Sequence, residues 1–131
     1  MDRKLLRAYL RNPQSRIEIV REFCRGKFVL DLGCVNHNIE NANAEQWLHR
    51  AVVEVASEVL GVDYLVDEVE MLRQQGYKVL AGDVTKPLPI DCKFDVIVVG
   101  HLIEHLSSFN GLLSNLRRLL APDGAVLIWP A

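Results

Sequence analysis

Three aspartates and one Gly-His pair fall at the ends of four short apolar runs of the sequence. In chain order, these ends read Asp31-Leu32-Gly33-Cys34, Asp63-Tyr64, Gly82-Asp83-Val84 and Gly100-His101. A carboxylate at such an end accepts hydrogen bonds from ribose hydroxyls or from an adenine amino group, and a glycine lets a ligand approach the backbone. Each aspartate alone also fits a turn or a helix cap. Because the set recurs on successive runs, it favours one site for a nucleoside-containing cofactor.

The loop after the first run narrows the choice of cofactor. A dinucleotide site needs the pattern G-x-G-x-x-G, with an acidic residue about 20 positions further on. Here the loop reads G-C-V-N-H-N from Gly33 to Asn38, and Asp63 follows Gly33 by 30 positions. The sequence also lacks the G-K-[ST] of a phosphate-binding loop. We therefore expect a nucleoside cofactor without a phosphate group.

The apolar runs alternate with helical patterns, and this alternation predicts the fold that positions the aspartates. Most of the runs are continuously apolar, as in strands that are covered on both faces. The pattern predicts an α/β, Rossmann-like, doubly wound and mostly parallel sheet of about five strands with N-terminal helices. The expected strands are 28–32, 59–63, 77–81, 94–99 and 125–129, and the expected helices are 2–11, 15–26, 44–56, 65–75 and 108–120.

Length and composition indicate one compact domain, with a helical segment at 1–26 and a cofactor-binding core at 27–131. The chain has 131 residues, of which 50% are hydrophobic, and a net charge of -2. This charge offers no general surface for nucleic acid. The three cysteines are widely spaced and odd in number, which fits a reduced, cytoplasmic protein. No apolar run approaches the roughly 20 residues that cross a bilayer.

Five sequence strings together resemble the ordered motifs of class I S-adenosylmethionine-dependent methyltransferases. They are FVLDLGC, VLGVDY, AGDVTKPLP, FDVIVVGHLIEHL and LRRLLAPDGAVLIWPA, and they span about 27–131. The string V-x-G-H-L-I-E-H-L and the segment Trp47-Leu48-His49 are most similar to small methyltransferases encoded with surface-polysaccharide biosynthesis. The resemblance implies S-adenosyl-L-methionine as the cofactor.

The resemblance also implies a cofactor pocket made by residues of four strand ends. The first end would line the methionine part, and the second would hold the ribose hydroxyls and stack near the adenine. The third would receive the adenine amino group and lie beside the ring, and the fourth would border the sulfonium and the substrate entrance. In that order the residues are Asp31, Gly33 and Cys34; Asp63 and Tyr64; Asp83 and Val84; and Gly100, His101 and Leu102.

The first loop departs from the family pattern. The family loop continues G-C-G-x-G, whereas this chain has Val35 after the cysteine, followed by Asn36 and Asn38. Valine adopts a positive φ only at a cost, although asparagine tolerates it better. The loop therefore either surrounds the cofactor in a different shape or is degenerate. The second alternative is a scaffold or partner subunit that binds S-adenosylmethionine without catalysis.

Two histidines after the fourth run are candidates for catalysis. Methyl transfer depends on the positions of donor and acceptor, and a hydroxyl acceptor also needs a general base, for which His101 or His105 is suited. The alternative for both histidines is a structural role, in packing or in capping a helix. His101, Glu104 and His105 also match H-x-x-E-H, a zinc motif of metallopeptidases. A zinc hydrolase would want a third ligand, and the one acidic residue downstream is Asp123 in a predicted turn.

The expected partner is a small-molecule acceptor, such as a sugar or metabolite hydroxyl, rather than a macromolecule. The resemblance implies seven strands, and this chain shows about five, so it is either a fragment or a compact variant without the last two. An open fifth strand would offer unpaired backbone groups, which predicts a homodimer through that edge. Arg117 and Arg118 are expected on a solvated face, and His49 on a partly exposed one.

Overall fold

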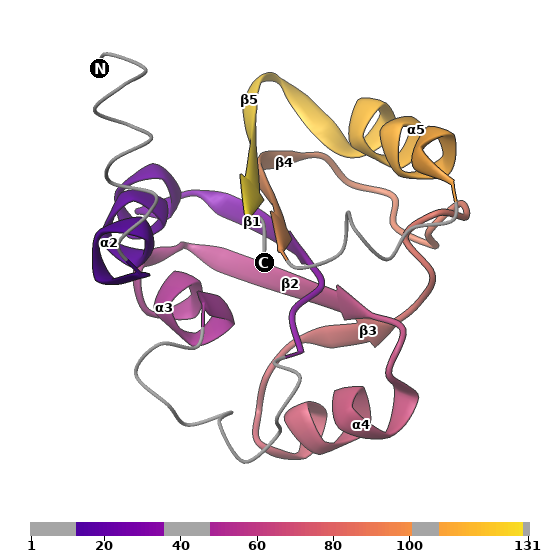
Figure 1. The fold of residues 1–131 in the computed structure, drawn as a ribbon, viewed down its shortest axis with the longest axis horizontal. Coiled ribbons are helices and arrows are strands. Elements are labelled where there is room, and N and C mark those ends of the chain that lie inside the picture. Colours follow the sequence, from indigo (N-terminus) through magenta and orange to yellow (C-terminus); the bar gives the residue numbers. More distant parts are fainter. Residues whose placement is uncertain (1–12, 36–47, 101–107, 130–131) are drawn as a thin grey trace.

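The computed structural model describes residues 13–35, 48–100 and 108–129 of the chain (Figure 1). Helices and strands alternate through these residues, as the sequence predicts. The helices are α2 (Pro13–Cys24), α3 (Leu48–Val55), α4 (Val66–Gln74) and α5 (Phe109–Leu119); the strands are β1 (Phe28–Leu32), β2 (Glu58–Asp63), β3 (Val79–Ala81), β4 (Phe94–Gly100) and β5 (Leu120–Trp129). The predicted helix 2–11 lies outside the described residues.

The five described strands form one sheet in the order β3-β2-β1-β4-β5. All four strand pairs are parallel. The chain therefore adds β2 and β3 on one side of β1, and β4 and β5 on the other. This arrangement confirms the predicted doubly wound fold and places the reversal of strand order between β1 and β4.

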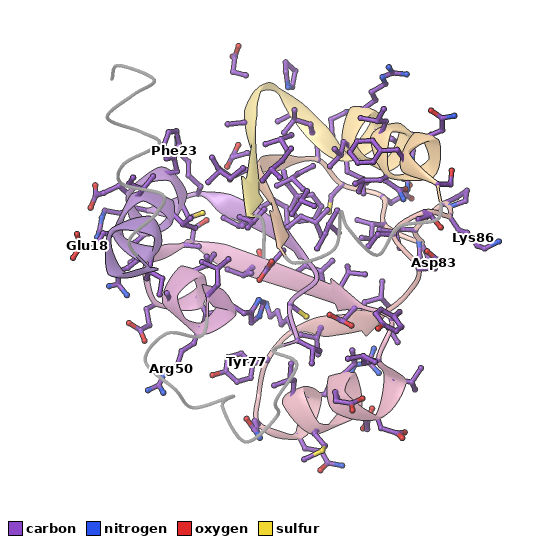
Figure 2. All side chains as sticks on the ribbon, in the orientation of Figure 1. Glu18, Phe23, Arg50, Tyr77, Asp83 and Lys86 are labelled. Atoms are coloured by element: carbon purple, nitrogen blue, oxygen red, sulfur yellow. The ribbon has the colours of Figure 1, made fainter. Side chains whose placement is uncertain are left out.

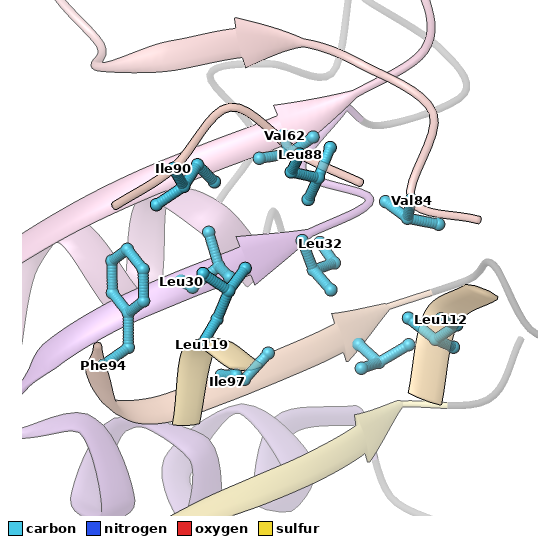
Figure 3. Packing of buried hydrophobic residues seen from close by; sticks show 11 residues of the cluster. Leu30, Leu32, Val62, Val84, Leu88, Ile90, Phe94, Ile97, Leu112 and Leu119 are labelled. Atoms are coloured by element: carbon cyan, nitrogen blue, oxygen red, sulfur yellow. The ribbon is translucent and has the colours of Figure 1, made fainter. Parts of the chain in front are cut away.

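Alternate residues of the central strands face two different apolar cores. Leu30 and Ile97 belong to the larger core, which α5 covers with Leu112 and Leu119 (Figure 3). Val29 and Val98 belong to the opposite core, which α2 and α3 cover. Both faces of β1 and β4 are thus buried, which explains why their sequences are almost continuously apolar. Figure 1 shows α2 next to α3, and α5 beside β4 and β5.

The start of β5 differs from the sequence-based expectation. We expected a strand from Ala125 after a stop signal at residues 122–124, but β5 begins at Leu120. The pairing with β4 shifts between Phe94↔Leu120 and Val96↔Ala125, so the turn-forming residues are accommodated as an irregularity inside the strand. Within the described parts of the chain, no helix has the length and apolar character that a membrane span requires.

Candidate functional site

The carboxyl ends of β1 and β4 lie next to each other at the reversal of strand order. Gly33, which follows β1, has a positive φ of 87°. A Cβ atom built on Gly100 at the end of β4 would lie 3.8 Å from the carbonyl oxygen of Gly33. Two residues predicted to bind the cofactor therefore meet where open α/β sheets place their ligands.

The carboxylate of Asp63 joins the end of β2 to the loop after β1. Its Oδ2 atom accepts the backbone N–H of Val35 at 3.1 Å, and its Oδ1 atom accepts that of Leu65 at 3.1 Å. Asp63 is buried, and burial raises the pKa of its carboxyl, although the hydrogen bonds from the backbone act in the opposite direction. A carboxylate has about four acceptor positions. The backbone N–H groups of Val35, Leu65 and Tyr64 use three of them, which leaves acceptor capacity for a ligand hydroxyl.

Asp31 lies within β1, near its carboxyl end, and contacts His49, a residue that the sequence did not relate to it. The Nδ1 atom of His49 on α3 is 2.6 Å from Oδ2 of Asp31, and the two side chains are 1% and 2% exposed. An ionised Asp31 accepts this hydrogen bond from the His49 tautomer that carries its proton on Nδ1. The expectation of a partly exposed His49 is wrong. No sequence signal relates the two residues, since they approach only when α3 packs on β1.

The absence of a side chain at Gly61 makes room for this pair. Gly61 is the parallel partner of Asp31 on β2. A Cβ atom there would lie 2.8 Å from both Cε1 of His49 and Sγ of Cys34. The ring of Tyr77 lies edge-on to that of His49, with 5.7 Å between the ring centroids. Helix α3 and the loop after β1 are therefore packed together over one small residue of β2.

Cys34, in the described part of the loop after β1, is buried. Burial is the main cause that raises the pKa of its thiol, and the nearby Asp31 and Asp63 raise it further. The thiol of Cys24 is also buried, and its pKa rises to about 12. Both thiols therefore stay protonated near neutral pH, which excludes them as nucleophiles. Cys34 contributes shape and packing to the loop.

Asp83 and Tyr64 are both exposed, and Figure 2 shows Asp83 at the edge of the molecule. Oδ1 of Asp83 accepts the backbone N–H of Thr85 at 2.9 Å and its hydroxyl at 2.7 Å. These hydrogen bonds hold the pKa of the Asp83 carboxyl below its usual range, so it is ionised at neutral pH. Tyr64 is 63% exposed. Val84, which follows Asp83 in the sequence, is buried in the larger core.

Two of the aspartates also have the turn-forming role that the sequence allowed. Asp63 and Asp83 each accept the N–H of the residue two positions further on, as in an Asx turn. Such a bond fixes the carboxylate relative to its strand without using all of its acceptor capacity. Both aspartates are therefore preorganised acceptors at the ends of β2 and β3.

The described site residues fit the nucleoside part of the expected cofactor. Asp63 offers acceptors for ribose hydroxyls, Tyr64 offers an exposed ring for stacking, and Asp83 offers a charged acceptor for an adenine amino group. Asp31 differs from these residues, because its carboxylate is buried and Oδ2 contacts His49. Its predicted contact with the methionine part of the cofactor stays a prediction.

Four residues with predicted roles lie outside the described part of the chain. They are His101, Leu102, Glu104 and His105. The prediction of His101 and His105 as a base, and the alternative zinc motif, therefore stay predictions. Among the described residues, no group of three or more His, Cys, Asp or Glu side chains is arranged to hold a metal ion.

Comparison with known proteins identifies the family. Residues 30–128 match the methyltransferase domain family. Among curated proteins, (S)-coclaurine N-methyltransferase of Thalictrum flavum subsp. glaucum is 27% identical over 121 residues, which cover 88% of this chain and 33% of that protein. The same enzyme of Papaver somniferum is 29% identical over 103 residues, which cover 79% of this chain and 29% of that protein. The chain thus spans about a third of the length of these relatives.

Solved structures give the same result. A TehB-like SAM-dependent methyltransferase from Corynebacterium glutamicum has a TM-score of 0.60 at 25% identity and covers 88% of this chain and 60% of that one. Coclaurine N-methyltransferase bound to N-methylheliamine and SAH has a TM-score of 0.62 at 20% identity, over 88% of this chain and 35% of that one. The predicted class I fold and S-adenosylmethionine cofactor are confirmed at the level of the family.

Proposed function

The chain belongs to the methyltransferase domain family, and we propose that it binds S-adenosylmethionine at the carboxyl ends of β1–β4 and transfers its methyl group to a small-molecule acceptor. The arrangement of Asp63 and Asp83 at the ends of two neighbouring strands carries the proposal, because each is fixed by the backbone and retains free lone pairs. Bound S-adenosylmethionine supplies an electrophilic methyl group, so the protein mainly has to hold donor and acceptor in line.

Each described site residue has a distinct part in this proposal. Asp63 accepts the ribose hydroxyls, Tyr64 covers the adenine, and Asp83 accepts the adenine amino group. Gly33 and Gly100 leave the space between β1 and β4 open to the methionine part of the cofactor. His101 and His105 are the proposed bases for an acceptor that must lose a proton.

The acceptor is proposed as a small molecule with a hydroxyl or an amine. A hydroxyl of a sugar or metabolite was the expectation from the sequence. The curated relatives are named as N-methyltransferases of (S)-coclaurine, a small amine acceptor. An amine acceptor would equally need a base to release its proton, so the proposed role of the histidines is the same for both.

Isothermal titration calorimetry with S-adenosylmethionine and S-adenosylhomocysteine tests the proposal. We expect both ligands to bind at one site, and Asp63→Asn to weaken both by about tenfold, which corresponds to one hydrogen bond to a charged group. Asp63→Asn is preferable to Asp63→Ala, since it keeps an acceptor for the N–H of Val35 or Leu65. The exposed Asp67→Asn on α4 is the matched control. Failure of the unchanged chain to bind either ligand at millimolar concentration would overturn the proposal.

We further propose a cytoplasmic location and self-association through β5. Cys24, Cys34 and Cys92 are free thiols, which suits a reducing compartment. β5 is an edge of the described sheet, and its Ile128 is 53% exposed. An edge strand of this kind can pair with that of a second copy. Light scattering that finds a monomer at high concentration would argue against the dimer.

A further inference from the structure

The connection between β3 and β4 lacks regular secondary structure, although it carries part of the larger core. Residues 82–93 contain no helix or strand, and Val84, Leu88 and Ile90 of this segment are buried. Asp83 lies at the start of the same segment. Buried backbone groups need hydrogen-bond partners. The segment makes two such bonds itself, from the N–H of Lys86 to the carbonyl oxygen of Asp83 and from the N–H of Ile90 to that of Leu88. Further partners come from side chains of α5.

Asn115 of α5 supplies three of these hydrogen bonds. Its Nδ2 atom donates to the carbonyl oxygens of Val84 at 2.7 Å and Lys86 at 2.8 Å. Its Oδ1 atom accepts the backbone N–H of Leu88 at 3.3 Å. Asn115 is 2% exposed and lies between the buried Leu112 and Leu119 on the core face of α5. A polar residue at this position would be costly if it had no partners. Both donors of its amide go to the segment, and its Oδ1 atom also accepts a hydrogen bond from Arg118 at 3.4 Å.

Arg118 and Gly111 extend the same contact along α5. The guanidinium of Arg118 donates to the carbonyl oxygens of Ile90 at 2.7 Å and Leu88 at 2.8 Å. At the other end, a Cβ atom on Gly111 would overlap the carbonyl group of Thr85, so the helix backbone lies directly on the segment. Arg118 is exposed, as expected, but it also has this fixed role.

Gly111, Asn115 and Arg118 occur at i, i+4 and i+7, and therefore share one face of the helix. We call these three residues the α5 clamp. Between them they contact the segment from Val84 to Ile90. Figure 2 places Asp83 and Lys86, at the near end of this segment, beside α5 at the edge of the molecule.

We infer that the α5 clamp positions Asp83 and the backbone of Val84 for recognition of the adenine amino group. This inference rests on the proposed function and adds three positioning residues that do not themselves touch the cofactor. The reason is geometric. Local hydrogen bonds from Thr85 and Lys86 hold the carboxylate and the carbonyl group of Asp83. Because α5 holds the backbone of residues 84–90, it sets where this turn lies relative to the rest of the site. Loss of one clamp contact should reduce the preference for adenine more than it reduces binding at the rest of the site.

Arg118→Met tests the clamp, because an exposed arginine can be replaced without a change in the core. Arg117→Met on the same helix is the matched control, since that residue is exposed and outside the clamp. Hydrogen exchange in the ligand-free chain should become about tenfold faster at the amides of residues 84–90 in Arg118→Met. Arg118→Lys, which can reach one carbonyl oxygen instead of two, should give an intermediate rate.

Calorimetry with two ligands then measures the effect on adenine recognition. The ligands are S-adenosylhomocysteine and S-inosylhomocysteine, in which an oxygen replaces the adenine amino group. The unchanged chain should prefer the adenine ligand, and Arg118→Met should reduce that preference by about fivefold while the affinity for the inosine ligand stays within about twofold. A general structural role would weaken both ligands equally.

Three results would overturn the inference. These are exchange rates in Arg118→Met equal to those in Arg117→Met, equal loss of affinity for both ligands, and an unchanged preference for the adenine ligand. If the unchanged chain binds neither ligand, the proposed function fails and adenine positioning fails with it, whereas the exchange rates still show whether the clamp holds the segment.

Discussion

The loop after β1 and the segment after β3 both lie at the carboxyl edge of the sheet, but different chemistry holds each of them. In the first, the buried carboxylate of Asp63 accepts the N–H of Val35, and the buried pair of Asp31 and His49 packs beside Cys34. Asn115 and Arg118 hold the second, through hydrogen bonds from an amide and a guanidinium to backbone carbonyls. The first region therefore depends on a buried carboxylate, whereas the second is held by an amide and a guanidinium, which do not titrate in the physiological range.

The two aspartates proposed to contact the cofactor show the same contrast. Burial raises the pKa of Asp63, and hydrogen bonds from Thr85 lower that of exposed Asp83. A buried acceptor has strong, weakly screened interactions with a ribose, while an exposed one competes with water and salt. We therefore expect contacts with the ribose to dominate the affinity for the cofactor, and contacts with the adenine to make smaller changes to it.

The largest predicted effect comes from the buried pair in the first region. His49→Leu leaves the carboxylate of Asp31 buried without its partner, so we expect a loss of about 3–5 kcal/mol in the free energy of unfolding. Urea denaturation measures this loss. Val53→Ala, at an exposed position of the same helix, should change stability by less than about 0.5 kcal/mol.

A double variant separates the pair from the packing around it. Asp31→Val combined with His49→Leu removes both polar groups, and we expect it to be more stable than His49→Leu alone. If the double variant is less stable than the single one, the cost arises from packing near Gly61 rather than from an unpaired charge. The contrast between the two regions would then lose its electrostatic basis.

A smaller effect should distinguish the two aspartates by pH. The raised pKa of Asp63 means that its contribution to stability is present below its ordinary value of 3.8 and is lost as pH rises through the pKa in the fold. The lowered pKa of Asp83 gives a contribution that is present above 3.8 and is lost as pH falls through its pKa in the fold. Solvent screening keeps the second contribution small.

Urea denaturation of Asp63→Asn and Asp83→Asn between about pH 3 and pH 7 measures both contributions. The stability of the unchanged chain relative to Asp63→Asn should fall as pH rises, and its stability relative to Asp83→Asn should rise. Slopes of the same sign for both variants would contradict the different environments of the two carboxyls.

The fold and the strand-end residues could be predicted from the sequence because they follow from periodicity. Continuous apolar runs identified strands that are buried on both faces, and the residue that ends each run then falls at one edge of the sheet. The start of β5 at Leu120 could not be predicted, because residues 122–124 carry a turn signal that the sheet accommodates as an irregularity.

The supports of the site were harder to predict, because they depend on tertiary packing. The contact of His49 with Asp31 has no local pattern. The α5 clamp had one usable signal, since Asn115 interrupts the leucines on the buried face of a helix, and a buried amide needs a partner. The sequence could not show that this partner is the backbone of residues 84–88.

Backbone NMR of the chain during titration with S-adenosylhomocysteine shows directly where the cofactor binds. We predict the largest amide shifts at Gly33, Val35, Tyr64, Asp83 and Gly100, at the carboxyl ends of four strands. Residues at the opposite edge of the sheet, where Lys27 and Asp95 line a separate depression, should not shift. Shifts confined to that opposite edge, or no shifts at saturating ligand, would contradict a cofactor site at the carboxyl ends of the strands.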